Sequence, residues 1–188
     1  SGYAYLATKD ALQMAGIEEK DLDSPKIGIV AGSGGASTRV MINSGDIARD
    51  KGPKRIGPYG VTKSMSSSIS AIIATALKLK GVNYSISSAC ATSAHCIGHA
   101  ADLIKSGQQD VVIAGGSDDE HWSSSCLFDA MGALSSNFNT SPASASRPYD
   151  VNRDGFVTKE DVIYLATYIT GLAGYEVDNL GDVTGDGK

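Results

Sequence analysis

The sequence predicts an α/β fold built on a parallel sheet. Residues 27–31 and 110–116 are short runs dominated by apolar residues and glycine, and residues 82–86 alternate apolar and polar side chains. A continuous apolar run of this length is typical of a strand buried on both faces. A segment with helical spacing separates residues 82–86 from residues 110–116, which predicts that these two strands pair in parallel through a right-handed crossover.

Composition limits the classes of protein to which the chain can belong. It has 188 residues, 41% of them hydrophobic, and a net charge of −5, which argues against nucleic acid as a partner. Its three cysteines form no disulfide framework and suggest a reducing compartment. No apolar run approaches the ~20 residues that cross a bilayer, and no signal segment or initiator Met is present. We therefore expect the chain to start inside a domain and to need no membrane.

Helical spacing recurs in three segments. Residues 3–15 carry an apolar stripe of Leu6, Ala7, Ala11, Leu12 and Met14. Residues 61–80 carry a second stripe of Met65, Ile69, Ile72, Ile73 and Leu77. The segment after Cys90 has its apolar residues at Ala94, Ile97, Ala101 and Ile104. Each segment is predicted to form one helix with that stripe buried.

A glycine-rich turn, residues 32–37, follows the first predicted strand directly. Such a turn between strand and helix can cradle a phosphate, but the spacing matches neither the dinucleotide fingerprint nor a P-loop. The alternative is a tight turn that lets two backbones approach closely. We favour that alternative.

Cys90 lies on the turn between the alternating strand and the helix that follows it. The positive end of a helix stabilises a thiolate, which is the nucleophilic form of cysteine. Small neighbours (Ser87, Ser88, Ala89 and Ala91) leave room for a substrate to approach. The alternative is a buried structural cysteine in a packed helix. From position alone the two interpretations remain open.

The sequence Ser-Ser-Ala-Cys-Ala-Thr-Ser at residues 87–93 resembles the nucleophile segment of the β-ketoacyl-[acyl-carrier-protein] synthases. Residues 81–85 and 128–135 make the match closer to the bacterial type I enzymes. The similarity is colinear from about residue 3 to residue 157. It implies one incomplete half of a thiolase-like α/β fold.

The resemblance also implies an activity, a decarboxylative Claisen condensation in which Cys90 takes the acyl group as a thioester. The family's two histidines and lysine belong to its second half, and His95, His99 and His121 match none of their motifs. We therefore expect an incomplete enzyme of fatty-acid synthesis that needs no cofactor. The implied partner is acyl carrier protein, the implied assembly is a homodimer formed through the strand before Cys90, and the implied location is the cytoplasm.

The resemblance assigns further residues. It implies an acyl pocket bordered by Gly34, Met65, Ala89 and Phe128. A basic cluster of Lys51, Lys54 and Arg55 corresponds to the family's carrier-protein docking residues. The simpler alternatives are a core methionine at residue 65 and a solvated loop at the basic cluster. His95 and His99 are expected to be ordinary helix residues, and Asp118, Asp119 and Glu120 to be mostly solvated.

Beyond residue 157 the sequence resembles something else, the dockerin, a small α-helical, EF-hand-like calcium-binding module of cellulosomal proteins. The loop positions of a first repeat are filled by Asp150, Asn152, Asp154, Gly155, Phe156, Thr158 and Asp161. A second copy begins at Asp182, 32 residues after Asp150, and is cut off at its seventh position. The resemblance implies Ca²⁺ at Asp150, Asn152, Asp154, Phe156, Thr158 and Asp161. The dockerin resemblance also implies a cohesin-like partner and an extracellular location.

The two resemblances divide the chain into residues 1–149, a synthase half, and residues 150–188, a dockerin-like segment. A natural fusion, a recombined or generated chain and a misassembled sequence would all look like this. The main hypothesis is a condensing enzyme with Cys90 as its nucleophile. The alternatives are a calcium-dependent binding module and a folded but inactive chimera.

Overall fold

The computed structural model describes residues 1–147, 149–150, 158–160 and 162, and the chain divides into two units, Ser1–His121 and Trp122–Lys188. Four of the expected calcium ligands, Asn152, Asp154, Phe156 and Asp161, lie outside the described residues, as does the second repeat. The expected domain boundary between residues 149 and 150 stays a prediction.

Three parallel strands form the sheet of the first unit, in the order β2-β1-β3. They are β1 (Ile27–Gly32), β2 (Asn83–Tyr84) and β3 (Val111–Gly116). All six residues of β1 are buried, as its continuous apolar run predicts. The parallel pairing is confirmed, although β2 is shorter than the alternating run that predicts it.

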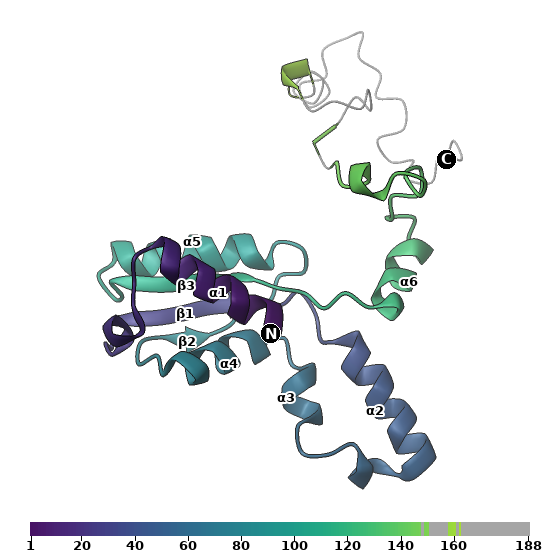
Figure 1. Ribbon diagram of the computed structural model, residues 1–188, viewed down its shortest axis with the longest axis horizontal. Helices are drawn as coiled ribbons and strands as arrows, with labels where there is room; N and C mark the ends of the chain where they lie inside the picture. Colours follow the sequence, from purple (N-terminus) through teal and green to yellow (C-terminus); the bar gives the residue numbers. More distant parts are fainter. Residues whose placement is uncertain (148, 151–157, 161, 163–188) are drawn as a thin grey trace. The chain divides into compact units, whose positions relative to one another are not determined.

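Helices cover both faces of this sheet (Figure 1). On one face Ile27, Ile29 and Ala31 pack against α1 (Gly2–Met14) and α4 (Ser68–Leu77). On the other face Val30 packs against α5 (Thr92–Lys105). Because successive side chains of a strand point to opposite faces, one apolar strand serves both layers.

Two apolar stripes were assigned wrongly. In α5 the buried residues are Thr92, Cys96, Ala100 and Leu103, whereas Ile97 and Ile104 are 55% and 44% exposed. Thr92 lies on this buried face, and its hydroxyl is hydrogen-bonded to the Ser88 N–H and the Ala89 carbonyl at the start of the helix. In α1 only Thr8 and Leu12 are buried, because the helix packs on one side alone.

The single helix expected over residues 61–80 is also wrong, because the chain forms two helices there. α3 (Gly60–Ser64) ends at Met65, whose backbone is extended, and α4 begins at Ser68. The Ser68 hydroxyl contacts the backbone carbonyls of Thr62 and, at 2.6 Å, of Met65. This serine offers the carbonyls of α3 a partner in place of continued helix, which explains the break.

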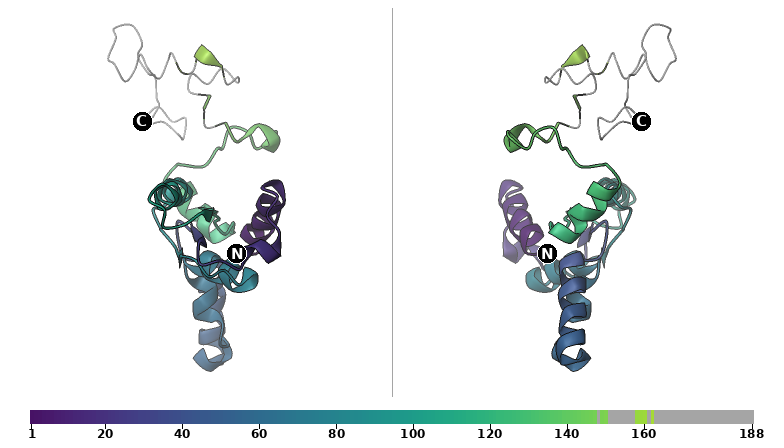
Figure 2. Two further views of the ribbon diagram at one scale, coloured as in Figure 1. Left: turned by 90° about the vertical axis from the view of Figure 1, so that its left-hand side faces the viewer. Right: turned by 90° about the vertical axis from the view of Figure 1, so that its right-hand side faces the viewer.

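The rest of the first unit connects these elements. It comprises η1 (Glu19–Leu22), α2 (Thr38–Lys51) and η2 (Pro53–Arg55). α2 and α3 lie side by side and project away from the sheet (Figures 1 and 2). α2 buries none of its residues fully.

The second unit contains α6 (Trp122–Ala130) and η3 (Pro142–Ser144). Within residues 137–147, η3 is the only helix or strand. The Arg147 guanidinium lies 4.2 Å from the Phe138 ring centroid and forms a 3.0 Å ion pair with Asp150. Over the described residues, no helix has the length and apolar character needed to span a membrane.

Candidate active site

Three loops meet at the carboxyl end of the sheet, because all three strands run in the same direction. The glycine-rich turn follows β1, the Cys90 segment follows β2, and residues 117–120 follow β3. In open parallel sheets ligands bind beyond these carboxyl ends, where the strand order reverses. With the order β2-β1-β3, the reversal lies between β1 and β3.

The glycine-rich turn lies against the Cys90 segment. A Cβ added to Gly34 would lie 2.6 Å from the Ala89 carbonyl oxygen, so only glycine fits here. The Ser87 hydroxyl donates to the Ser33 carbonyl at 2.9 Å. The expected tight turn with close backbone approach is therefore confirmed.

Cys90 follows a residue in an unusual conformation. Ala89 has a φ of 46°, in the left-handed region that favours glycine. The Thr92 hydroxyl accepts from the Ser88 backbone N–H and donates to the Ala89 carbonyl, both at 2.8 Å. Cys90 is exposed, whereas Cys96 is fully buried in α5. The structural-cysteine alternative thus describes Cys96 and not Cys90.

The acidic residues after β3 do more than carry solvated charge. The Asp118 carboxylate accepts from the Ser33 hydroxyl at 2.7 Å and from the Gly34 backbone N–H at 2.8 Å. Asp119 accepts from the Ser37 hydroxyl at 2.6 Å and lies 3.6 Å from Arg39. Both carboxylates therefore hold the glycine-rich turn. Their position just after a parallel neighbour of β1 was the sequence signal that could have revealed this role.

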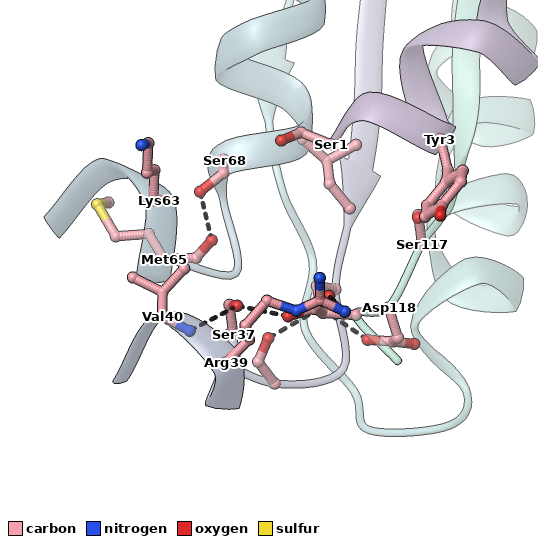
Figure 3. A pocket seen from close by; sticks show the side chains of 14 residues that line it. Ser1, Tyr3, Ser37, Arg39, Val40, Lys63, Met65, Ser68, Ser117 and Asp118 are labelled. Carbon is pink, nitrogen blue, oxygen red and sulfur yellow. Dashed lines mark hydrogen bonds and ion pairs between the residues drawn. The ribbon is translucent and has the colours of Figure 1, made fainter. Parts of the chain in front are cut away.

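A polar pocket of about 240 Å³ lies beside these loops, within the first unit (Figure 3). Its lining includes Ser33, Gly35, Ser37, Arg39, Lys63, Met65, Ser117, Asp118 and Asp119. Met65 is 48% exposed and lines this pocket, so the core-methionine alternative is wrong. Gly34 and Ala89 lie against each other but are not among the residues that line this pocket.

The remaining expected residues are placed as follows. Lys51, Lys54 and Arg55 are all exposed, at the end of α2 and in η2. Phe128 lies in α6 of the second unit and is 43% exposed.

His99 lies on α5, and its Nε2 is hydrogen-bonded to the Tyr84 hydroxyl at 2.6 Å. Across the described part of the chain, no three His, Cys, Asp or Glu side chains are grouped to hold a metal ion. His95 and His99 both lie in α5, and their expected role as ordinary helix residues stays a prediction.

The exposed cysteine on its strained strand-to-helix turn lies within a part of the chain that is similar to known proteins. Residues 2–164 match the family described as "Beta-ketoacyl synthase, N-terminal domain". The chain belongs to this ketoacyl synthase family.

Two bacterial relatives of this ketoacyl synthase chain are especially similar. It is 52% identical over 158 residues to 3-oxoacyl-[acyl-carrier-protein] synthase 1 of Haemophilus influenzae, with 84% of this chain covered. It is equally identical over 157 residues to the enzyme of the same name from Escherichia coli strain K12, with 82% covered. The chain spans only 39% of the length of each relative.

A solved structure shares the fold. It is a complex of a type II polyketide-synthase acyl-carrier protein with its ketosynthase bound to the hexaketide. The match has a TM-score of 0.68 at 28% identity and covers 83% of this chain and 40% of the other. The fold is therefore the thiolase-like ketosynthase fold, present here in part.

Proposed function

We propose that this chain carries the nucleophile half of a β-ketoacyl-[acyl-carrier-protein] synthase, with Cys90 as the acyl acceptor. The observation that carries the proposal is the exposed thiol on the strained turn before α5, at the carboxyl end of the sheet. The family membership and the 52% identity to two synthases support it.

The proposed step is transfer of an acyl group from a carrier thioester to Cys90. The thiolate attacks the thioester carbonyl, a new carbon–sulfur bond forms, and the carrier thiolate leaves and takes up the proton that Cys90 gave up. The Cys90 backbone N–H and the N-terminus of α5 stabilise the oxyanion on the tetrahedral intermediate. No cofactor is required.

The proposed condensation would then need groups to decarboxylate malonyl carrier protein. His95, His99 and His121 do not fill those roles, and His99 is held by Tyr84. We therefore propose that these 188 residues form the acyl-enzyme without releasing a condensation product. Catalytic groups that act as a unit lose most of their effect when members are removed.

Acyl carrier protein is the proposed partner, in the cytoplasm. Lys51, Lys54 and Arg55 form an exposed basic cluster that suits an acidic carrier.

A homodimer through β2 is proposed as well. Among the described strands β2 pairs only with β1, so its outer edge is open. The proposed acyl pocket is bordered by Gly34, Met65 and Ala89 of the first unit; the expected contribution of Phe128, in the second unit, stays a prediction from the resemblance.

The test is incubation with an acyl carrier thioester, followed by peptide mass spectrometry. We expect the mass of the acyl group on Cys90, and no label at that peptide in Cys90→Ala. A matched control is Cys126→Ala, which should acylate like the wild type. Acylation that persists in Cys90→Ala, or no acylation of the wild type, would refute the assignment.

A second proposal concerns calcium. Asp150, Asn152, Asp154 and Asp161 offer the oxygen ligands that Ca²⁺ prefers, and the 32-residue repeat in the sequence supports a dockerin-like module with a cohesin-like partner. The Asp150 side chain is 1% exposed and pairs with Arg147, so a metal ion would have to share that carboxylate. The family match runs through the same residues, which favours the synthase alternative.

Isothermal titration of metal-free protein with Ca²⁺ decides between these alternatives. Binding in the millimolar range or tighter that is lost in Asp154→Ala would support the calcium proposal. Asp129→Ala, which removes a carboxylate outside the loop, is the control. Equal heats from Asp154→Ala and the wild type, or no heat from either protein, would refute the calcium proposal and support the alternative that residues 150–157 belong to the synthase fold.

A further inference from the structure

We infer that Asp118 is a positioning residue that holds the Cys90 turn in its reactive geometry, acting through the glycine-rich turn. The inference rests on the proposed role of Cys90 as the acyl acceptor. It extends that role to a residue that lies one strand away and touches neither Cys90 nor Ala89 through any hydrogen bond of the described residues.

The first step is that Asp118 is hydrogen-bonded to two residues of the glycine-rich turn. Its Oδ1 lies 2.7 Å from the Ser33 Oγ and 2.8 Å from the Gly34 backbone nitrogen. The Ser33 hydroxyl also lies 2.8 Å from the Gly35 carbonyl, but the carboxylate is the stronger acceptor for its single proton. Charge-assisted hydrogen bonds are roughly twice as strong as neutral ones, so this carboxylate fixes both residues.

The second step is the contact between that turn and the nucleophile segment. The Ser33 carbonyl accepts from Ser87 at 2.9 Å, three residues before Cys90. Gly34 leaves no room for a Cβ against the Ala89 carbonyl oxygen, which would lie 2.6 Å away. Because Ala89 must stay at a φ of 46°, it needs neighbours that prevent relaxation. On one side of Ala89, Asp118 is hydrogen-bonded to Gly34. On the other side, the Thr92 hydroxyl donates a hydrogen bond to the Ala89 carbonyl.

The adjacent Asp119 provides a matched comparison. It is bonded to Ser37 at the start of α2 and lies 3.6 Å from Arg39, at the far end of the turn from Gly34. Removing either carboxylate changes the net charge equally. Only Asp118 is bonded to the two residues that contact the Cys90 segment, so the two variants separate position from charge.

Hydrogen–deuterium exchange of the whole chain tests the mechanical link. In Asp118→Ala we expect the amides of residues 88–92 to exchange about tenfold faster, because their turn has lost a support worth a charged hydrogen bond. Asp119→Ala should leave them unchanged, and Asp118→Asn, whose side-chain oxygen still accepts, should restore most of the protection. Protection of the buried residues of α4 shows that each variant is folded. Unchanged exchange at residues 88–92 in folded Asp118→Ala overturns the inference.

Acyl transfer tests the functional link. With the hexanoyl thioester of N-acetylcysteamine, Asp118→Ala should acylate Cys90 about tenfold more slowly than the wild type, while iodoacetamide labels Cys90 at a rate within about twofold. Equal acylation rates in Asp118→Ala and an active wild type would overturn the inference and leave the proposed function intact. A wild type that does not acylate refutes the proposed function, and the exchange experiment still decides whether Asp118 holds the turn.

Discussion

The two ends of the sheet both carry dense hydrogen bonding, but they differ in burial and strain. At the amino end Gln109 is 5% exposed and binds the Val82 N–H and the Pro25 carbonyl, so its amide joins β2 to the segment before β1. At the carboxyl end Ser33 and Asp118 are accessible, and Ala89 is held in a left-handed conformation. One end joins the strands, whereas the other presents a thiol.

The difference shows how a parallel sheet separates stability from chemistry. A buried amide with all its partners in place stabilises the fold and leaves nothing to react. Strain at an exposed turn persists only where the surrounding structure enforces it, and it gathers at functional sites. Variants at the two ends should therefore change different measurements.

The largest expected effect is at the carboxyl end. Alkylation with iodoacetamide near pH 7 should label Cys90 fastest, exposed Cys126 more slowly and buried Cys96 only on unfolding. Cys90→Ala should remove the fast phase entirely and change the free energy of unfolding by less than ~0.5 kcal/mol, since an exposed side chain is lost. Faster labelling of Cys126 or Cys96 would show that this end of the sheet is not the reactive one.

The substitution Gly34→Ala should have the next largest effect. Its Cβ would lie 2.6 Å from the Ala89 carbonyl oxygen, so the Cys90 turn must shift. We expect acyl transfer to Cys90 to slow about tenfold and stability to fall by roughly 1–3 kcal/mol. Gly35→Ala is the matched control, because nothing lies within 4 Å of its added Cβ. If both variants acylate at the wild-type rate, the contact between the two turns has no role in the reaction.

Gly81→Ala tests the amino end. Its Cβ would lie 2.2 Å from the Gln109 amide oxygen and 2.5 Å from the Ile27 carbonyl oxygen. Urea denaturation should show a loss of roughly 1–3 kcal/mol, while the folded protein acylates Cys90 at an unchanged rate. Gly98→Ala, with nothing within 4 Å inside α5, should be neutral or stabilising. A slower acylation in folded Gly81→Ala would contradict the separation of the two ends.

The smallest effect is expected at the exposed ion pair between α1 and η1. Lys9 donates to Glu19 at 2.8 Å, and this hydrogen bond, then the charge of Lys9, holds the pKa of Glu19 below its ordinary value of 4.5. A carboxyl with a lowered pKa stabilises the fold above its unfolded pKa and loses that effect as the pH falls through the folded one. The urea midpoints of wild type and Glu19→Gln should differ slightly at pH 7 and converge below pH 4.5. A difference that persists at lower pH would exclude the ion pair as its cause.

The sequence predicts β1 well, because a strand buried on both faces must be apolar throughout. The burial expected for β3 is wrong, since its residues are half-buried or exposed. The sequence does not predict the buried face of α5. Ile97 and Ile104 look like core residues, but small side chains at Cys96 and Ala100 let the helix lie close to the sheet. It also misses the break at Met65, which depends on one hydroxyl at Ser68.

The site shows the same division. The turn that carries Cys90 could be predicted from its own neighbours, whereas the proposed role of its thiol also needed the resemblance of residues 87–93 to a known family. The residues next to Asp118 in the sequence do not reveal its role, because its partners Ser33 and Gly34 lie 85 and 84 residues earlier. Only its position just after a parallel neighbour of β1 points to that role. Local sequence therefore locates the turn that carries the proposed nucleophile, and topology locates the carboxylate that is hydrogen-bonded to the neighbouring turn.

The central position of β1 also has a consequence during synthesis on the ribosome. β1 is the first strand made, yet Ile27 pairs with Val111 of β3, which is synthesised after every other element of the sheet. At roughly 5–20 residues per second, the segment Ile27–Gly32 waits about 4–17 s for that partner. During this interval β1, which is fully buried in the folded sheet, lacks one of its two neighbours, and transiently exposed apolar surface of this kind is prone to aggregation.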